Sequence, residues 1–173
     1  MPLIFDPQTV PVRSIDDHLP AVPPDRLTAS ALRERFQRAA VWQPEHVADR
    51  LRLPRAATHA SVLVPLVLRD GRITALLTQR ADHLSDHPGQ ISFPGGRAEP
   101  HDATAEVTAL REAEEEIGLA PDFVQVLGTL PTYTTVTGYV VTPVVALVEP
   151  GFPLRIDPLE VAAVFEVPLA HLM

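Results

Sequence analysis

The chain of 173 residues contains no cysteine. Disulfide bridges, thiolate nucleophiles and cysteine-ligated zinc are therefore excluded from its chemistry, and a reducing compartment suits it. Basic residues are also scarce, with 14 Lys and Arg against 22 Asp and Glu, which gives a formal net charge of −8. Little basic surface is left to displace counterions from a nucleic-acid backbone, so we expect no nucleic-acid partner.

Long apolar runs that would target or anchor the chain are missing as well. The N-terminal segment MPLIFDPQTVP has too short an apolar run for a secretory signal and lacks a basic residue before it. The uncharged stretch 126–148 is long enough to cross a bilayer, but it contains six threonines, two prolines and two glycines. We therefore expect strands of a soluble protein here, no membrane partner and a cytoplasmic location.

The residues that are present indicate a single globular domain preceded by an arm. A hydrophobic fraction of 46% and this length suit one compact core. Six of the 19 prolines precede Arg26, where no periodicity supports a packed element. We therefore predict an extended arm over residues 1–26 and a folded domain over residues 27–173.

Local patterns predict one short helix and a series of strands. The segment TASALRERFQRAA is a helix candidate capped by Thr28, because Leu32 and Phe36 recur at helical spacing. Asp70 and Gly71 form a strong hairpin signal between two segments rich in strand-forming residues. The predicted strands cover residues 61–68, 73–79, 123–130, 139–148 and 161–167.

The order of these elements indicates the class of fold. Strands on both sides of a central helix predict a mixed α/β sandwich. Within the first strand, Pro65 lacks a backbone donor, so it predicts an edge position or a bulge there.

The second helix, residues 103–117, carries most of the acidic residues of interest. Glu112, Glu115 and Glu116 lie at i, i+3 and i+4, so their side chains converge on one face, whereas Glu114 points elsewhere. We expect Asp102 to cap its beginning. An apolar stripe is predicted to face the sheet; it comprises Ala103, Val107, Leu110, Ala113 and Ile117. Gly118 suits the left-handed position after the last turn, and Pro121 prevents continuation.

A glycine pair precedes this helix and supports a binding role for the carboxylates. An acidic helical face is usually just solvated, and that interpretation stays open. Gly95 and Gly96, in the segment FPGG, would let bare backbone approach a ligand closely. Carboxylate and carbonyl oxygens suit a hard divalent cation, Mg²⁺ or Mn²⁺, shared with substrate phosphates.

The sequence GGRAEPHDATAEVTALREAEEEIGL, residues 95–119, resembles the signature loop and helix of the Nudix hydrolases. These enzymes cleave nucleoside diphosphates linked to another group. In the first half of the family pattern, five residues separate a glycine from an acidic residue; here these are Gly96 and Asp102. The second half runs from an arginine to a glycine, which are Arg111 and Gly118 in this chain. This chain departs from the pattern in carrying Asp102 in place of glutamate, and in having eight residues instead of seven before Arg111.

The resemblance implies an α/β/α sandwich with a mixed β-sheet and a catalytic loop-helix-loop. It also implies the site residues. The metal ligands would be Gly96, Glu112, Glu115 and Glu116, which would hold Mg²⁺ or Mn²⁺. The catalytic residues would be Glu116, Glu115, Arg111 and Glu160. Arg111 would orient the glutamates, and Glu116 and Glu160 are alternative proton acceptors.

A second stretch, LLTQRADHLSDHPGQISFPGG (residues 76–96), resembles the element before the Nudix signature in coenzyme A pyrophosphatases. Ser85 departs from that subfamily, which commonly has arginine there. The likeness covers residues 60–172 and implies hydrolysis of coenzyme A or its derivatives to 3′,5′-ADP and 4′-phosphopantetheine. The substrate-binding residues would be Arg80, Gly89, Gln90 and Phe93.

Other interpretations of these residues stay open. Arg80 has the geometry to grip a phosphate with two donors, but a salt bridge to Asp82 is the ordinary alternative. His83 and His87 have the spacing of helical zinc ligands, although the following Pro-Gly pair makes a helix there unfavourable and favours surface or substrate contacts.

The resemblance also leaves the substrate and assembly open. The same metal helix could serve ADP-ribose, a dinucleotide or a nucleoside triphosphate, or belong to a non-catalytic nucleotide-binding module. A homodimer is compatible with the family. Its members usually continue to a further strand and a closing helix, so these are either missing here or dispensable.

Overall fold

The computed structural model describes Pro11 and residues 20–38, 58–135 and 138–173. Most of the predicted arm lies outside these ranges, so that prediction is not tested; the end of the arm and Leu27 form a short 3-10 helix, η2 (Pro24–Leu27). Within the described ranges no helix is long and apolar enough to cross a membrane.

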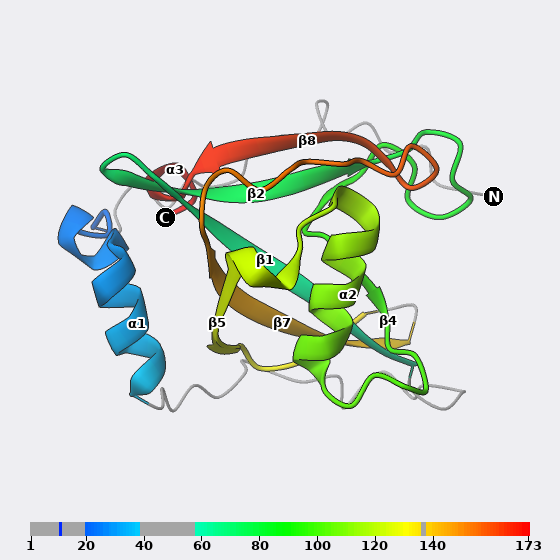
Figure 1. Ribbon diagram of the computed structural model, residues 1–173, viewed down its shortest axis with the longest axis horizontal. Helices are drawn as coiled ribbons and strands as arrows, with labels where there is room; N and C mark the ends of the chain where they lie inside the picture. Colours follow the sequence, from blue (N-terminus) through cyan, green and yellow to red (C-terminus); the bar gives the residue numbers. More distant parts are fainter. Residues whose placement is uncertain (1–10, 12–19, 39–57, 136–137) are drawn as a thin grey trace.

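The described strands form one mixed sheet (Figure 1). The strands are β1 (Thr58–Arg69), β2 (Arg72–Arg80), β3 (Ile91–Ser92), β4 (Gly95–Arg97), β5 (Val124–Thr129), β6 (Tyr133–Thr134), β7 (Tyr139–Val148) and β8 (Val161–Pro168). The central order is β3-β2-β1-β7-β5, with β4 beside β1, β6 beside β7 and β8 beside β2. The β1 and β7 strands are parallel, and the other pairs are antiparallel. All five longer strands predicted from the sequence are confirmed.

The strands β1 and β2 form a hairpin whose far ends separate, and this separation, called the split below, positions the site. The turn is at Asp70 and Gly71, as predicted, and Gly71 has a φ of 70°, which glycine adopts easily. The two strands pair only near this turn, through residues 66–69 and 72–75. Farther along, β4 pairs with the beginning of β1, and β3 pairs with the end of β2. The short segment 91–97 therefore joins the two sides of the split.

Pro65 lies inside a central strand with no bulge, but one side of the strand is unpaired at this residue, so the predicted edge position is confirmed on that side only. Its register with β7 is regular, opposite Ala146. The N–H of Leu63 donates to the carbonyl of Pro94 at 2.8 Å, on the side of β1 away from β7. The nitrogen of Pro65, two residues on, points to the same side, where neither β2 nor β4 pairs with it. A missing donor therefore costs nothing at that gap.

Helices cover both faces of the sheet. They are α1 (Ala29–Gln37), α2 (Ala105–Ile117), the short α3 (Leu169–Leu172) and the 3-10 helix η3 (Pro121–Phe123). Along β7, Val144, Ala146 and Val148 join the core under α2, whereas Val145 and Leu147 join the core under α1 and α3. This alternation shows a sheet buried on both faces, as the α/β/α prediction requires. Figure 1 shows α1 and α2 well apart, with β5 and β7 between them in that view.

The helix ends test the capping predictions. Thr28 caps α1, as predicted, by accepting a hydrogen bond from the N–H of Ala31 at 3.2 Å. The prediction that Asp102 caps α2 was wrong, because Thr104 is the cap and accepts from Val107 at 3.3 Å. Gly118 ends α2 in the left-handed conformation, with a φ of 73°, as predicted.

The buried face of α2 is rotated from the predicted apolar stripe. Ala113 and Ile117 are fully buried, as expected, but Val107 is 42% exposed. The buried face instead includes Thr108 and Glu116. The helix therefore places Glu116 toward the sheet, and the spacing of apolar residues does not predict this orientation.

Candidate active site

Glu116 lies at the contact between α2 and the β4 strand. Its side chain is nearly buried, and its Oε2 accepts a hydrogen bond from the N–H of Gly95 at 3.2 Å. The pKa of Glu116 is raised to about 7, chiefly by burial; the charges of Glu112 and Glu160 contribute to the rise, whereas the Gly95 hydrogen bond and Arg80 oppose it. Near neutral pH this carboxyl group is therefore able to take up or release a proton.

Glu112 lies against the neighbouring glycine. A Cβ atom on Gly96 would be 2.5 Å from Oε2 of Glu112, so the backbone approaches this carboxylate more closely than any other residue allows. Burial is the main cause of a raised Glu112 pKa; nearby Glu115 and Glu160 add to it, and Arg111 lowers it. Two carboxylates of α2 thus face the glycine pair.

Glu115 is separated from these two carboxylates. Its side chain is 60% exposed, and its Oε2 accepts from Nη1 of Arg111 at 2.9 Å. The predicted trio is therefore divided in the described structure, with two members facing the glycine pair and one held outward by an arginine.

Arg111 is the centre of a hydrogen-bond network that fixes the loop to the helix. It donates to both oxygens of Asp102, with Nε–Oδ1 at 3.2 Å and Nη2–Oδ2 at 2.9 Å. Its Nη2 also lies 3.0 Å from Oε1 of Glu112 and 3.1 Å from the carbonyl oxygen of Arg97. These contacts hold Arg111 between the loop and the two acidic residues of its own helix.

Asp102 has a structural role different from the predicted cap. Its side chain has no exposed surface. Besides Arg111, the N–H of Glu99 and the hydroxyl of Thr108 donate to it, at 2.9 Å and 3.0 Å. These bonds, chiefly the one from Arg111, hold the pKa of Asp102 well below its usual range, and the same pair raises the pKa of Arg111. Asp102 is therefore a permanent anion that anchors the arginine.

Glu160 reaches the site from the segment before β8. The N–H of Asp157 donates to the carbonyl of Glu116 at 2.9 Å, which ties this segment to the end of α2. The carbonyl of Glu160 accepts from the N–H of Ala81 at 2.9 Å, beside the end of β2. Its side chain is exposed, yet its charge raises the pKa of both Glu112 and Glu116. The fold thus brings a residue far along the chain to the same carboxylates.

Three of the predicted substrate-binding residues are joined by backbone hydrogen bonds at the base of the loop between β2 and β3. The N–H of Arg80 donates to the carbonyl of Gln90 at 2.9 Å, and that of Gly89 donates to the carbonyl of Arg80 at 3.2 Å. The Arg80 side chain donates to the carbonyl of Asp86 at 3.4 Å, and across the described residues it has no salt bridge to Asp82 or another carboxylate. Its charge lowers the pKa of Glu116, so the guanidinium group lies within electrostatic range of that carboxyl group.

Phe93 and the two histidines lie differently. The ring of Phe93 packs against the core under α1, on the face of the sheet opposite α2. His83 and His87 are exposed in a loop of turns, where His87 has a positive φ of 55°. The loop presents both side chains to solvent.

The donor chemistry fits a hard divalent cation. Glu112 and Glu116 are oxygen donors whose charges repel each other while burial removes water from them. A cation would relieve that repulsion, and oxygen donors favour Mg²⁺ or Mn²⁺. Among the described residues, no three acidic or histidine side chains are already grouped to hold a metal. Further ligands would therefore come from backbone, water or substrate.

Two residues of this site make contacts that the sequence does not predict. The glycine pair predicts a close approach of bare backbone, but not that the N–H of Gly95 donates to Glu116. Asp102 binds Arg111, nine residues away, instead of capping the helix. The one signal for this contact in the sequence is the position of an acidic residue before the arginine in the family pattern.

Several known proteins are similar to this chain in sequence. The "Uncharacterized Nudix hydrolase NudL" of Escherichia coli K12 is 52% identical over 112 residues, which cover 65% of this chain and 58% of that protein. The Shigella flexneri protein of the same name is 49% identical over 120 residues, which cover 69% of this chain and 62% of that protein. This chain therefore spans less than two thirds of the length of these curated relatives.

Solved structures show the same fold at low identity. The Nudix hydrolase RenU of M. smegmatis superposes with a TM-score of 0.54 at 23% identity, covering 64% of this chain and 70% of that one. An Ap4A hydrolase of C. elegans, in a binary complex, gives 0.53 at 19% identity and covers 62% and 77%. The Nudix domain of Shewanella oneidensis NrtR, complexed with ADP ribose, gives 0.51 at 22% identity and covers 74% and 81%.

The family itself is identified by a match to the NUDIX domain over residues 57–172. That range contains the whole sheet, the glycine pair and the acidic helix. Because the match extends over more than half of the chain, the protein belongs to the NUDIX domain family, and its mixed α/β/α fold is the fold of that family.

Proposed function

We propose that this site hydrolyses the pyrophosphate bond of a nucleoside diphosphate derivative with the help of a divalent metal. The observation that carries the proposal is the position of Glu112 and Glu116, which are held against the bare backbone of Gly95 and Gly96. In the reaction, water attacks one phosphorus of the pyrophosphate, the bridging bond breaks, and each product keeps one phosphate ester.

The metal would be held by Glu112, Glu116 and the carbonyl oxygen of Gly96. Glu115 would join them once it leaves Arg111, an exchange that costs little for an exposed ion pair. When bound, Mg²⁺ or Mn²⁺ supplies positive charge to the substrate oxygens and lowers the pKa of water.

Side chains of the protein would orient the metal ligands and the substrate and accept a proton. Arg111, anchored by Asp102, would orient the glutamates of α2. Arg80 would grip a substrate phosphate with its guanidinium group. Glu116, with a pKa raised to about 7, is suited to accept a proton near neutral pH, and the exposed Glu160 is the alternative acceptor.

Coenzyme A or a derivative is the leading substrate, with 3′,5′-ADP and 4′-phosphopantetheine, or its acylated form, as products. The support is the likeness of residues 76–96 to the coenzyme A pyrophosphatase element; these residues run from β2 to β4 and border the carboxylates. A second substrate class, ADP-ribose or a dinucleotide, is favoured by two structural neighbours, one complexed with ADP ribose and one named an Ap4A hydrolase.

A substrate panel with separated products tests the proposal. Coenzyme A, ADP-ribose, Ap4A and ATP would be incubated with the protein and Mg²⁺ or Mn²⁺, and the products resolved by chromatography. We expect cleavage of coenzyme A at its diphosphate to be fastest. If ADP-ribose or Ap4A is cleaved faster, that compound replaces coenzyme A as the proposed substrate. Nucleotide binding without any cleavage would instead indicate a binding module.

A matched pair of variants ties the activity to the site. Glu112→Gln keeps the shape of the side chain and removes one anion beside Gly96, so we expect it to abolish metal-dependent turnover. Glu114→Gln makes the same change on the same helix at an exposed position away from the pair, and it should keep full activity. Equal activity in both variants would contradict the assignment.

A further inference from the structure

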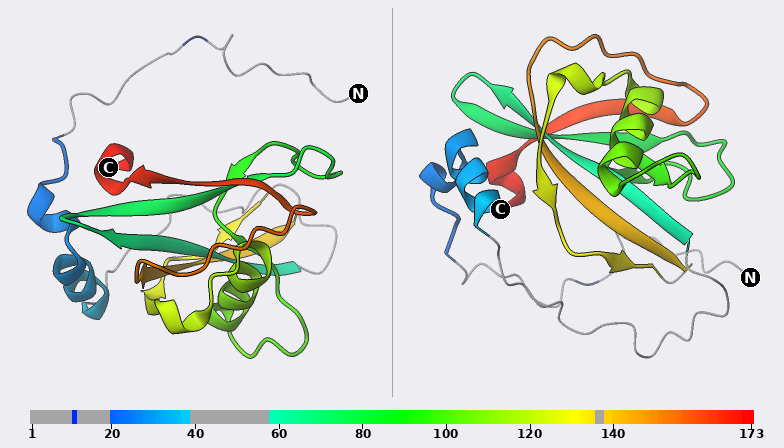
Figure 2. Two further views of the ribbon diagram at one scale, coloured as in Figure 1. Left: turned by 45° about the horizontal axis from the view of Figure 1, so that its top comes forward. Right: turned by 60° about the horizontal axis from the view of Figure 1, so that its bottom comes forward.

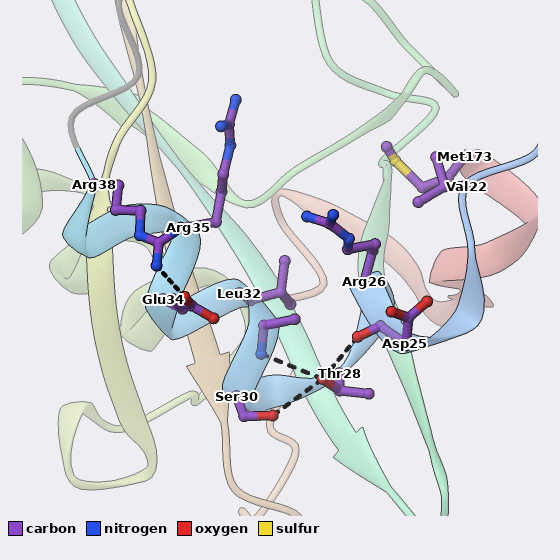
Figure 3. Close-up of a pocket in the computed structure, with 11 residues that line it drawn as sticks. Val22, Asp25, Arg26, Thr28, Ser30, Leu32, Glu34, Arg35, Arg38 and Met173 are labelled. Carbon is purple, nitrogen blue, oxygen red and sulfur yellow. Dashed lines mark hydrogen bonds and ion pairs between the residues drawn. The ribbon is translucent and has the colours of Figure 1, made fainter.

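A second concave region lies away from the carboxylates, between η2, α1 and the last residue (Figure 3). It is an open pocket of about 940 Å³, within the size range of small-molecule sites. The pocket is next to the helix whose Leu32 and Phe36 pack on the sheet face opposite α2. Helix α3 approaches η2 here, as Figure 2 also shows. This pocket and the proposed active site are therefore separate.

The pocket concentrates positive charge in a protein with a net charge of −8. Arg26, Arg35 and Arg38 line it, against two acidic residues, Asp25 and Glu34. Glu34 is paired with Arg38 at 2.5 Å along the exposed helix surface. In the described part of the chain, Arg26 and Arg35 form no ion pair, and Figure 3 shows their side chains extending from η2 and α1.

Arg33, on the same helix as Arg35, has a guanidinium group with a structural partner, unlike Arg26 and Arg35. The Nε of Arg33 donates to Oε1 of Gln125 at 2.9 Å and so ties α1 to β5. Arg26 and Arg35 have no such side-chain partner among the described residues, so their charge is available to a ligand. Two guanidinium groups that line one pocket from different elements can each donate to the oxygens of a phosphate group.

We propose that this pocket binds a small phosphorylated compound through Arg26 and Arg35, with Arg38 as a third donor. The pocket volume favours a metabolite over a polymer, and its apolar wall, formed by Val22, Leu32 and Met173, would contact the uncharged part of such a compound. The proposal does not depend on the hydrolytic function. The pocket residues contain no pair of buried carboxylates, so binding here requires no divalent metal.

Binding of inorganic pyrophosphate in the presence of EDTA tests the proposal directly. Chelation removes the metal that phosphate binding at the α2 site would need. The arginine Nε–Hε signals of the ¹⁵N-labelled chain would be followed by NMR during the titration. We expect saturable shifts of Arg26 and Arg35. Arg26→Gln and Arg35→Gln should each weaken binding by about tenfold or more, because a charged hydrogen bond to phosphate contributes at least that factor.

Arg33→Gln is the matched control, since it removes the same charge from the same helix outside the pocket. Unchanged affinity in this variant supports a defined site. An equal loss in Arg33→Gln and Arg35→Gln would show only general charge attraction and would overturn the proposal. Shifts confined to Arg80 and Arg111, or no saturable shift at all, would overturn it as well.

Discussion

The contact between Gly96 and Glu112 allows a perturbation of one carboxylate that leaves the backbone unstrained. A Cβ atom at Gly96 would meet Oε2 and Cδ of Glu112 at 2.5 Å, and no other group is as close. The contacted atoms are the far end of a flexible side chain, so that side chain can move. Gly96→Ala should therefore displace the Glu112 carboxylate by about 1 Å, the distance needed to restore ordinary contact.

A shift of this size is large for a reacting site but small for the fold. Misplacing a catalytic group by about 1 Å can cost about 100-fold in rate, which corresponds to about 2.7 kcal/mol. The free energy of unfolding should change by only about 1 to 2 kcal/mol, because the movement loosens the mostly buried ion pair with Arg111 without removing either partner.

The assay compares kcat/KM with Mg²⁺, using the compound cleaved fastest in the panel, and measures unfolding in urea. Glu112→Ala removes the contacted atoms, so adding Gly96→Ala to that variant should not alter stability, whereas the activity loss from Gly96→Ala in the wild-type background should be about 100-fold. Full activity of Gly96→Ala would refute the reasoning. So would a destabilisation of several kcal/mol that persists after Glu112 is truncated, since the clash would then involve the backbone.

Three further predictions concern the supports of the site and the sheet. Asp102→Asn should lower metal-dependent activity by about 10- to 100-fold, because Arg111 loses the anion that anchors it; steady-state kinetics checks this, and unchanged kinetics would contradict it. Gly118→Ala should destabilise the protein by about 1 to 2 kcal/mol in urea unfolding, because its φ is 73° and an added Cβ would lie 2.9 Å from Cβ of Arg155; a neutral effect would show that α2 can end differently. The pKa of Glu166 is lowered, chiefly by Arg69, so its stabilising contribution should be present above the usual carboxyl pKa and be lost on acidification below about 4.5. Glu166→Gln should flatten that acid dependence of the unfolding free energy, and an unchanged slope would exclude this ion pair as a cause.

The sequence by itself determined the features that depend on neighbours along the chain. The Thr28 cap, the hairpin at Asp70, the end of α2 at Gly118 and the strand β7 follow from backbone preferences and from spacing over a few residues. The α/β class followed from the order of such segments. The family signature identified Glu112 and its neighbours as residues of interest, because their spacing on a helix does not depend on the rest of the fold.

The tertiary structure decided which way these groups face and which distant groups meet them. The sheet buried Glu116 against Gly95 and left Glu115 outside with Arg111, although all three residues lie on one helix. It also brought Glu160 from the segment before β8 to the same carboxylates. Burial is the largest cause of both raised pKa values, and burial arises only when atoms from separate elements are packed together. The acid–base character of the site therefore arises with the packing of α2, β4 and the segment before β8, which local sequence preferences do not encode.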